Sequence, residues 1–113
     1  MNQYNPLSPA QFQILLALAD EERHGYGIMQ EVAERSSGKM RLGPGTLYGN
    51  IKKMMAAGLI EESDKPVVLE DDDPRRRYYR LTDQGQKAAV DEARRLADAV
   101  RDAQLKNLIP RTI

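Results

Sequence analysis

Two clusters of long cationic side chains are the residues of this sequence best suited to binding a polyanion. The stretch from Ser36 to Ile60 contains no aspartate or glutamate. Its bases are Lys39, Arg41, Lys52 and Lys53. The second cluster follows an acidic stretch and consists of Arg75, Arg76, Arg77 and Arg80. Because lysine and arginine bind phosphate groups, both clusters are candidates for contacting a nucleic-acid backbone, although two solvated faces of opposite charge explain the pattern equally.

Catalytic and metal chemistry has little support in the sequence. The chain has no cysteine and a single histidine, His24, which excludes disulfides, cysteine-ligated metals and most histidine-based metal or triad sites. The turn at Gly43-Pro44-Gly45 lacks the lysine and the serine or threonine of a P-loop. We therefore expect no enzymatic activity, no metal and no cofactor, and we expect His24 to be a turn residue.

The composition is that of one globular domain. The 113 residues carry 17 Lys+Arg against 17 Asp+Glu, 41% of them are apolar, and the mean hydropathy is -0.63. No apolar run approaches the roughly 18 residues that a membrane span needs, and no signal peptide is visible. We expect a cytoplasmic protein with no membrane partner.

Residue patterns predict helices near residues 9–21, 25–35, 44–57 and 83–108, and strands near 59–63 and 76–82. Ser8 and Gln11 have the spacing of a capping box at the start of the first helix, and Thr82 is placed to cap the last. The expected fold class is mainly α with a small β-wing. It consists of a winged helix-turn-helix over residues 1–82 and a long C-terminal dimerisation helix over 83–113, the two forming one compact structural unit.

We expect two helices to need a partner chain to cover them. Apolar residues of the last helix recur at a heptad-like spacing, and such a seam of small side chains stabilises a lone helix poorly. The first helix is apolar on two sides, and the second side suggests burial against a partner subunit. The residues expected at a dimer interface are Ile14, Leu18, Ala89, Ala93, Leu96, Val100 and Ala103.

The third helix has a polar face that suits DNA. If Leu47, Ile51 and Met54 point inward, the outward residues are Gly45, Gly49, Lys52 and Lys53, with Thr46 and Tyr48 on the flanks. Thr46 suits a base edge, and Tyr48 suits a phosphate or a base unless its ring packs against the domain. Gly49 costs about 1 kcal/mol relative to alanine inside a helix, so it either permits close approach to DNA or only weakens the helix. Asn50 lies nearer the core edge and is a weaker candidate for reading adenine.

Four short motifs occur in order along the chain. They are Gly25-Tyr26-Gly27-Ile28, Gly45-Thr46-Leu47-Tyr48, Gly58-Leu59-Ile60, and Arg77-Tyr78-Tyr79-Arg80-Leu81-Thr82 followed by Gly85. Together they resemble the PadR family of bacterial transcriptional regulators, with a match from roughly Leu15 to Gly85. The chain length resembles the short PadR subfamily, and Gly49 departs from the proline that many members carry. The resemblance implies a homodimer held by the C-terminal helices that usually acts as a repressor released by a small ligand.

The expected partner is double-stranded DNA, in the form of a pseudo-palindromic operator with half-sites about 34–36 Å apart. The residues expected to contact it are Tyr26, Lys39, Arg41, Gly45, Thr46, Tyr48, Gly49, Lys52, Lys53, Arg75, Arg76 and Arg77. Tyr26 stands at a helix N-terminus that offers N–H groups to phosphate, although a packing role is the alternative. The wing arginines either contact DNA or pair with three acids at the hairpin tip, Asp71, Asp72 and Asp73.

The resemblance also implies a planar hydrophobic effector between the C-terminal helices and the first helix of the partner. The candidate lining residues are Ile14, Ala93, Leu96, Ala97 and Val100. The chain has no tryptophan, so the ligand-stacking mode of some relatives does not carry over. A dry seam packed on alanines is the alternative to a ligand site. A winged-helix protein-interaction module without DNA binding is the alternative to a DNA-binding regulator.

Overall fold

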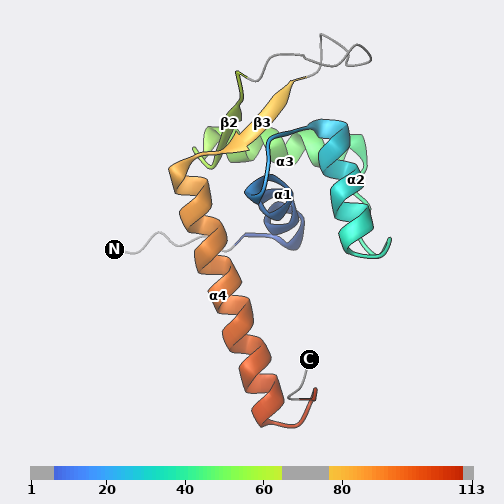
Figure 1. The fold of residues 1–113 in the computed structure, drawn as a ribbon, viewed down its shortest axis with the longest axis vertical. Helices are drawn as coiled ribbons and strands as arrows, with labels where there is room; N and C mark the ends of the chain where they lie inside the picture. The colour runs from blue at the N-terminus through green and yellow to red at the C-terminus, as the bar shows by residue number, and fades with distance from the viewer. Residues whose placement is uncertain (1–6, 65–76, 111–113) are drawn as a thin grey trace.

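The computed structural model describes residues 7–64 and 77–110, which form four helices and a three-stranded antiparallel sheet (Figure 1). The elements follow the chain as α1 (Pro9–Ala19), β1 (Arg23–His24), α2 (Gly25–Arg35), α3 (Pro44–Ala56), β2 (Ile60–Glu62), β3 (Tyr78–Leu81) and α4 (Asp83–Leu105). The mainly helical fold class with a small sheet is confirmed. Helices α1 and α4 each end two to three residues earlier than the sequence pattern predicted.

Local hydrogen bonds set the helix boundaries. Ser8 caps α1 through a capping box: its hydroxyl accepts from the Gln11 N–H at 3.1 Å, and its own N–H donates to the Gln11 side-chain oxygen at 3.1 Å. At the other end of α1, the Arg23 guanidinium donates to the carbonyl of Ala17 at 2.6 Å and satisfies an acceptor that the helix leaves open. Thr82 caps α4, as the sequence predicted.

The sheet has the strand order β1-β3-β2, so β3 lies at its centre. Strands β2 and β3 pair antiparallel and correspond to the two predicted strands. Strand β1 was not predicted; it pairs Arg23 with Tyr79 and His24 with Tyr78. Two residues are too few for an alternating pattern to reveal a strand.

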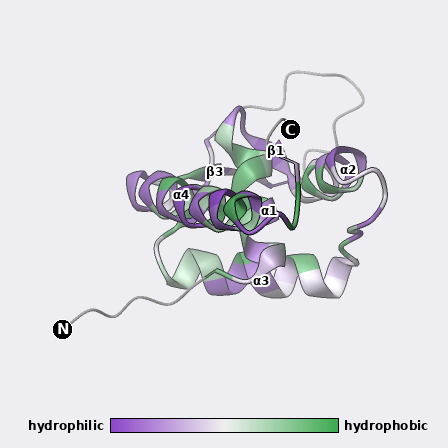
Figure 2. Ribbon diagram, turned by 90° about the horizontal axis from the view of Figure 1, so that it is seen from below, coloured by the Kyte–Doolittle hydropathy of each residue, from purple (hydrophilic) through white to green (hydrophobic). Residues whose placement is uncertain are grey.

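Helix α1 lies in the middle of the molecule, with α2, α3, α4 and the sheet around it (Figure 2). The second apolar side is covered, because Ile14 and Ala17 have no exposed surface and Leu18 is 4% exposed. On the first side Leu15 is buried, Phe12 and Leu16 are half-buried, and Ala19 is exposed. The prediction that a partner subunit covers the second side is therefore wrong. A fully buried side chain has no surface to offer a second chain, so Ile14 and Leu18 are removed from the dimer interface and Ile14 from the ligand wall.

Among the described residues, the buried positions of helix α4 all lie in its first half. Ala89 and Glu92 are buried, whereas every residue from Ala93 to Asp102 is exposed. Figure 1 shows the second half of α4 extending away from the other elements. Ala89 therefore belongs to the core of its own chain and, like Ile14, is removed from the predicted dimer interface. The predicted apolar seam of α4 is divided into a buried part at Ala89 and an exposed part from Ala93 onward.

Candidate nucleic-acid interface

Helix α3 presents an apolar face to the core and a polar face to solvent. Leu47, Ile51 and Met54 are at most 3% exposed, as predicted. The exposed side carries Gly45, Thr46, Tyr48, Gly49, Lys52 and Lys53. A β-carbon at either glycine would meet no atom within 4 Å, so the helix surface there is open to a large ligand.

Among the described residues, the cations of α3 and of the loop before it have no acidic partner. Lys39, Arg41, Lys52 and Lys53 are exposed, and none of them forms an ion pair within residues 7–64 and 77–110. Their charges therefore add up to a positive surface. Uncompensated positive charge of this kind attracts phosphate groups and makes binding sensitive to salt.

Tyr48 reaches from α3 to the beginning of α2. A β-carbon at Gly25 would lie 2.2 Å from the Tyr48 hydroxyl oxygen and 2.7 Å from its Cζ atom, so the ring occupies the space that a side chain at this position would need. Tyr48 is 48% exposed, and Tyr26, the residue after Gly25, is 54% exposed. The structure therefore brings two predicted contact residues to the N-terminal end of α2, and neither ring is buried in the core.

His24 holds the same end of α2. Its Nδ1 accepts from the Gly27 N–H at 3.0 Å, which is the N-cap bond of the helix. Its ring stacks on Tyr26 with the centroids 6.5 Å apart and meets Tyr78 edge-on at 5.3 Å. The expectation that His24 is only a turn residue is wrong, because His24 belongs to β1, caps α2 and packs on a residue of β3.

The described arginines of the wing are paired with acids of the neighbouring strand. Arg77 lies 2.9 Å from Glu62, and Arg80 lies 2.9 Å from Glu61. The hydrogen bond and the negative charge of Glu61 raise the pKa of Arg80. Arg75, Arg76, Asp71, Asp72 and Asp73 lie outside the described ranges. For them the two alternatives, contact of the arginines with DNA or pairing of the arginines with the aspartates, stay predictions.

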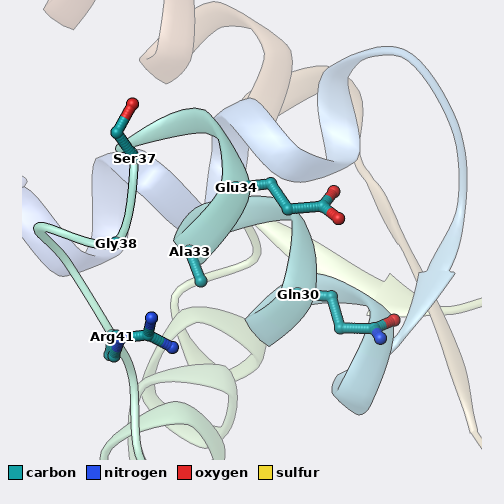
Figure 3. Close-up of a pocket in the computed structure, with 6 residues that line it drawn as sticks. All are labelled: Gln30, Ala33, Glu34, Ser37, Gly38 and Arg41. Atoms are coloured by element: carbon teal, nitrogen blue, oxygen red, sulfur yellow. The ribbon is translucent and has the colours of Figure 1, made fainter.

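A surface hollow of about 360 Å³ lies between α2 and the loop that leads to α3 (Figure 3). Its lining residues are Gln30, Ala33, Glu34, Ser37, Gly38 and Arg41. The Arg41 side chain extends from the loop over Gly38, whose φ of +79° lies in the left-handed region that glycine favours. Arg41 therefore lies beside α2 and is not part of the exposed face of α3.

A second cavity, of about 220 Å³, lies between α1 and α4. Its lining residues are Leu7, Pro9, Phe12, Gln13, Glu92, Arg95 and Leu96. Glu92 is 4% exposed and accepts a hydrogen bond from the Arg95 guanidinium at 2.9 Å, so this wall carries an ion pair beside its apolar side chains. Sequence reasoning missed Glu92 because glutamate in a helix is normally solvated. Of the predicted ligand residues, Leu96 lines the cavity. Three others are exposed on α4 instead: Ala93, Ala97 and Val100.

The part of the chain that the structure describes contains no group of three histidine, cysteine, aspartate or glutamate side chains arranged to hold a metal ion. Within the same residues, none of the helices is both long and apolar enough to cross a membrane. The site is thus defined by its cations, its two exposed tyrosines and the surface of α3.

Comparison with known proteins identifies the family. Residues 14–91 match the model of the transcriptional regulator PadR-like family. The chain is 34% identical over 89 residues to transcriptional regulator Rv3488 of Mycobacterium tuberculosis, a match that covers 79% of this chain and 77% of the relative. Among solved structures it is similar to RosR of H. salinarum, at 27% identity and a TM-score of 0.66, covering 90% of this chain and 89% of the other.

A further solved structure is that of Bacillus subtilis PadR in complex with operator DNA. It is 23% identical, has a TM-score of 0.62, and the match covers 76% of this chain and 47% of that one, so it shows a shared fold. The motifs found in the sequence all lie within the matched residues 14–91. The family consists of regulators, so the chain is a regulator and not an enzyme. This chain belongs to the PadR-like family of transcriptional regulators.

Proposed function

We propose that this PadR-family regulator is a DNA-binding repressor whose helix α3 enters the major groove of an operator. The observation that carries the proposal is the exposed, acid-free face of α3, whose lysines have no acidic partner among the described residues. Lys52 and Lys53 bind phosphates, while Thr46 contacts a base edge. Gly45 and Gly49 let the backbone approach the DNA closely. B. subtilis PadR, which shares the fold, has been solved in complex with operator DNA, and this supports DNA as the ligand.

The other contacts flank α3. Tyr26 and Tyr48 contact a phosphate at the N-terminal end of α2, where backbone N–H groups favour an anion. Arg77 exchanges Glu62 for a phosphate at little cost, since both partners are exposed and exposed ion pairs contribute little free energy. The remaining proposed contacts come from the loop before α3 and from the wing: Lys39, Arg41, Arg75 and Arg76.

Two copies bind the operator together in the cytoplasm, joined through α4 in residues 83–113, while residues 1–82 bind the DNA. Leu96 and Val100 are 37% and 42% exposed on a helix that extends from the body, and burying such apolar surface favours association. Ala93 and Ala103 lie on the same seam. A two-fold dimer matches a pseudo-palindrome with half-sites about 34–36 Å apart.

Release by a small hydrophobic ligand completes the proposal. The cavity between α1 and α4 places Phe12 and Leu96 next to the proposed dimer face. A ligand held there, with further contacts from Ala93, Ala97 and Val100, would bind one arrangement of the two α4 helices better than another. It would shift the dimer towards that arrangement.

Fluorescence anisotropy with a labelled duplex from the DNA upstream of the gene tests the proposal. Affinity for this duplex should exceed affinity for random DNA and should fall steeply with salt. Replacing both lysines, Lys52→Ala with Lys53→Ala, should reduce the slope of log affinity against log salt by about 1 per lysine. The matched control is Lys87→Ala on α4 with Lys106→Ala at its C-cap, which removes the same charge and should leave the slope unchanged.

A winged-helix protein-interaction module without DNA binding is the second candidate. The ion pairs of Arg77 and Arg80 favour it, because they neutralise the described cations of the wing. Equal affinity for upstream and random DNA at every salt concentration would contradict the proposal that the protein reads an operator. The protein-interaction module would then be the remaining candidate function.

A further inference from the structure

A chain of hydrogen bonds joins the beginning of α1 to the first half of α3. The Gln11 side-chain nitrogen donates to the Asn50 side-chain oxygen at 3.3 Å. The Asn50 side-chain nitrogen donates in turn to the carbonyl of Thr46, one turn earlier in α3, at 2.9 Å. The Gln11 side-chain oxygen accepts from the Ser8 N–H at 3.1 Å at the same time. The N-cap of α1 is thus connected to the turn of α3 that carries Thr46.

Both side-chain amides are already engaged within the chain. Reading adenine through two hydrogen bonds takes the oxygen and the nitrogen of an asparagine together. In Asn50 the oxygen is bound to Gln11 and the nitrogen to Thr46, and the side chain is half-buried. Its place in the structure therefore suits holding α3 rather than reading a base.

The first half of α3 needs such a restraint. Its N-cap is Gly43, which makes no side-chain cap hydrogen bond. Gly45 and Gly49 lie within the same half, and glycine loses more conformational freedom on folding than any other residue. Apolar packing of Leu47 and Ile51 sets how closely α3 approaches the core, but apolar contacts have no preferred direction. A hydrogen bond, in contrast, fixes both a distance and an angle.

We propose that Gln11 and Asn50 are positioning residues that orient the first half of α3 and thereby set the sequence specificity of DNA binding, without contacting the DNA. The inference rests on the proposed function. Phosphate contacts by lysines tolerate a small rotation of the helix because their side chains are long and flexible. A base contact by the short Thr46 side chain does not tolerate it, so the positioning residues control discrimination more than total affinity.

The test uses Gln11→Glu in the full-length chain. Glutamate at this position keeps the capping box of α1 but presents an oxygen to the Asn50 oxygen where the glutamine presented a donor. The ratio of affinities for upstream and random duplexes should fall about three- to tenfold, which corresponds to the loss of one hydrogen bond. The salt slope and the melting temperature should stay close to those of the wild type.

The matched control is Gln86→Glu, which adds the same negative charge to the first half of α4. The Gln86 side chain is exposed and lines neither of the two cavities described above. This variant should keep the wild-type ratio. Asn50→Ala should lose as much discrimination as Gln11→Glu, and the double variant should lose no more than either alone, because both remove the same connection.

The possible outcomes distinguish failure of this inference from failure of the proposed function. A wild type that distinguishes the duplexes, with an unchanged ratio in Gln11→Glu, overturns the inference and leaves the proposed function standing. A wild type that does not distinguish them overturns the proposed function and the inference with it. A loss in Asn50→Ala without a loss in Gln11→Glu would assign Asn50 to direct base reading and overturn its positioning role.

Discussion

At the scale of single residues, close packing between elements decides which groups face solvent around α3. The Tyr48 ring occupies the space beside Gly25, so the glycine is needed for clearance there. Tyr79, on the central strand, is 5% exposed. Burial raises the pKa of its hydroxyl, the charges of Tyr48 and Glu62 raise it further, and Arg77 lowers it.

Tyr79 should make the fold sensitive to alkaline pH. Since its pKa is higher in the folded chain than in the unfolded one, its contribution to stability is fully present below about pH 10 and is lost as the pH rises through the folded value. Urea unfolding across this range should show the free energy of unfolding falling by at most about 1.4 kcal/mol per pH unit from this group.

Tyr79→Phe should flatten that dependence, because phenylalanine has no hydroxyl to ionise. The control is Tyr26→Phe, which removes a hydroxyl from a half-exposed ring and should keep the wild-type profile. Identical profiles for Tyr79→Phe and the wild type would show that the buried hydroxyl does not cause the alkaline loss.

At the scale of elements, the start of α4 is locked to the chain that enters β2. The Thr82 N–H donates to the carbonyl of Leu59 at 3.1 Å, and the Thr82 hydroxyl donates to the carbonyl of Gly58 at 2.6 Å. A β-carbon at Gly85 would lie 1.9 Å from the same Leu59 carbonyl oxygen. The glycine that follows the wing motif is thus required by close approach of two backbones.

Gly85→Ala should lower the free energy of unfolding by about 3 kcal/mol, since a backbone carbonyl cannot move aside as a flexible side chain can. Gly49→Ala is the matched comparison, because it makes the same substitution inside a helix at a position with no atom within 4 Å. It should raise stability by about 1 kcal/mol. Urea denaturation measures both, and a change of the same sign in the two variants would contradict the account of Gly85.

At the scale of the whole molecule, zero net charge and a basic binding face coexist because the charges are segregated. The acid-free stretch from Ser36 to Ile60 includes α3, whereas arginines and acids on β2 and β3 pair with one another. Since total charge governs long-range attraction to any DNA, non-specific affinity should be modest. In the proposed function, discrimination then depends on the shape of α3 and on two copies binding together.

Val100→Glu should separate the proposed dimer, because it places a charge in the apolar seam of the extended half of α4. Light scattering at tens of micromolar should give the mass of one chain for the variant and of two for the wild type. The operator affinity of the variant should also fall, because two separate chains must then bind the two half-sites independently. Arg94→Gln changes the net charge equally on another side of α4 and should remain dimeric. A monomeric wild type would remove the role proposed for α4.

Much of this architecture is visible in short stretches of sequence. The capping box at Ser8, the cap at Thr82 and the inward face of α3 depend on residues a few positions apart, and all three were predicted correctly. Strand β1 was not, because it exists only where β3 lies beside it. The two apolar sides of α1 were found, but the cover of the second side was assigned to the wrong chain.

The sequence by itself determined the helix boundaries to within a few residues, the polar face of α3 and the family motifs. Only the tertiary structure decided that the second apolar side of α1 is covered by its own chain, that Tyr48 lies beside Gly25, and that Gln11 is bonded to Asn50. The physical reason is one of range. Periodicity and capping record which side of an element is buried and where it ends, whereas the identity of what covers that side depends on how distant segments meet.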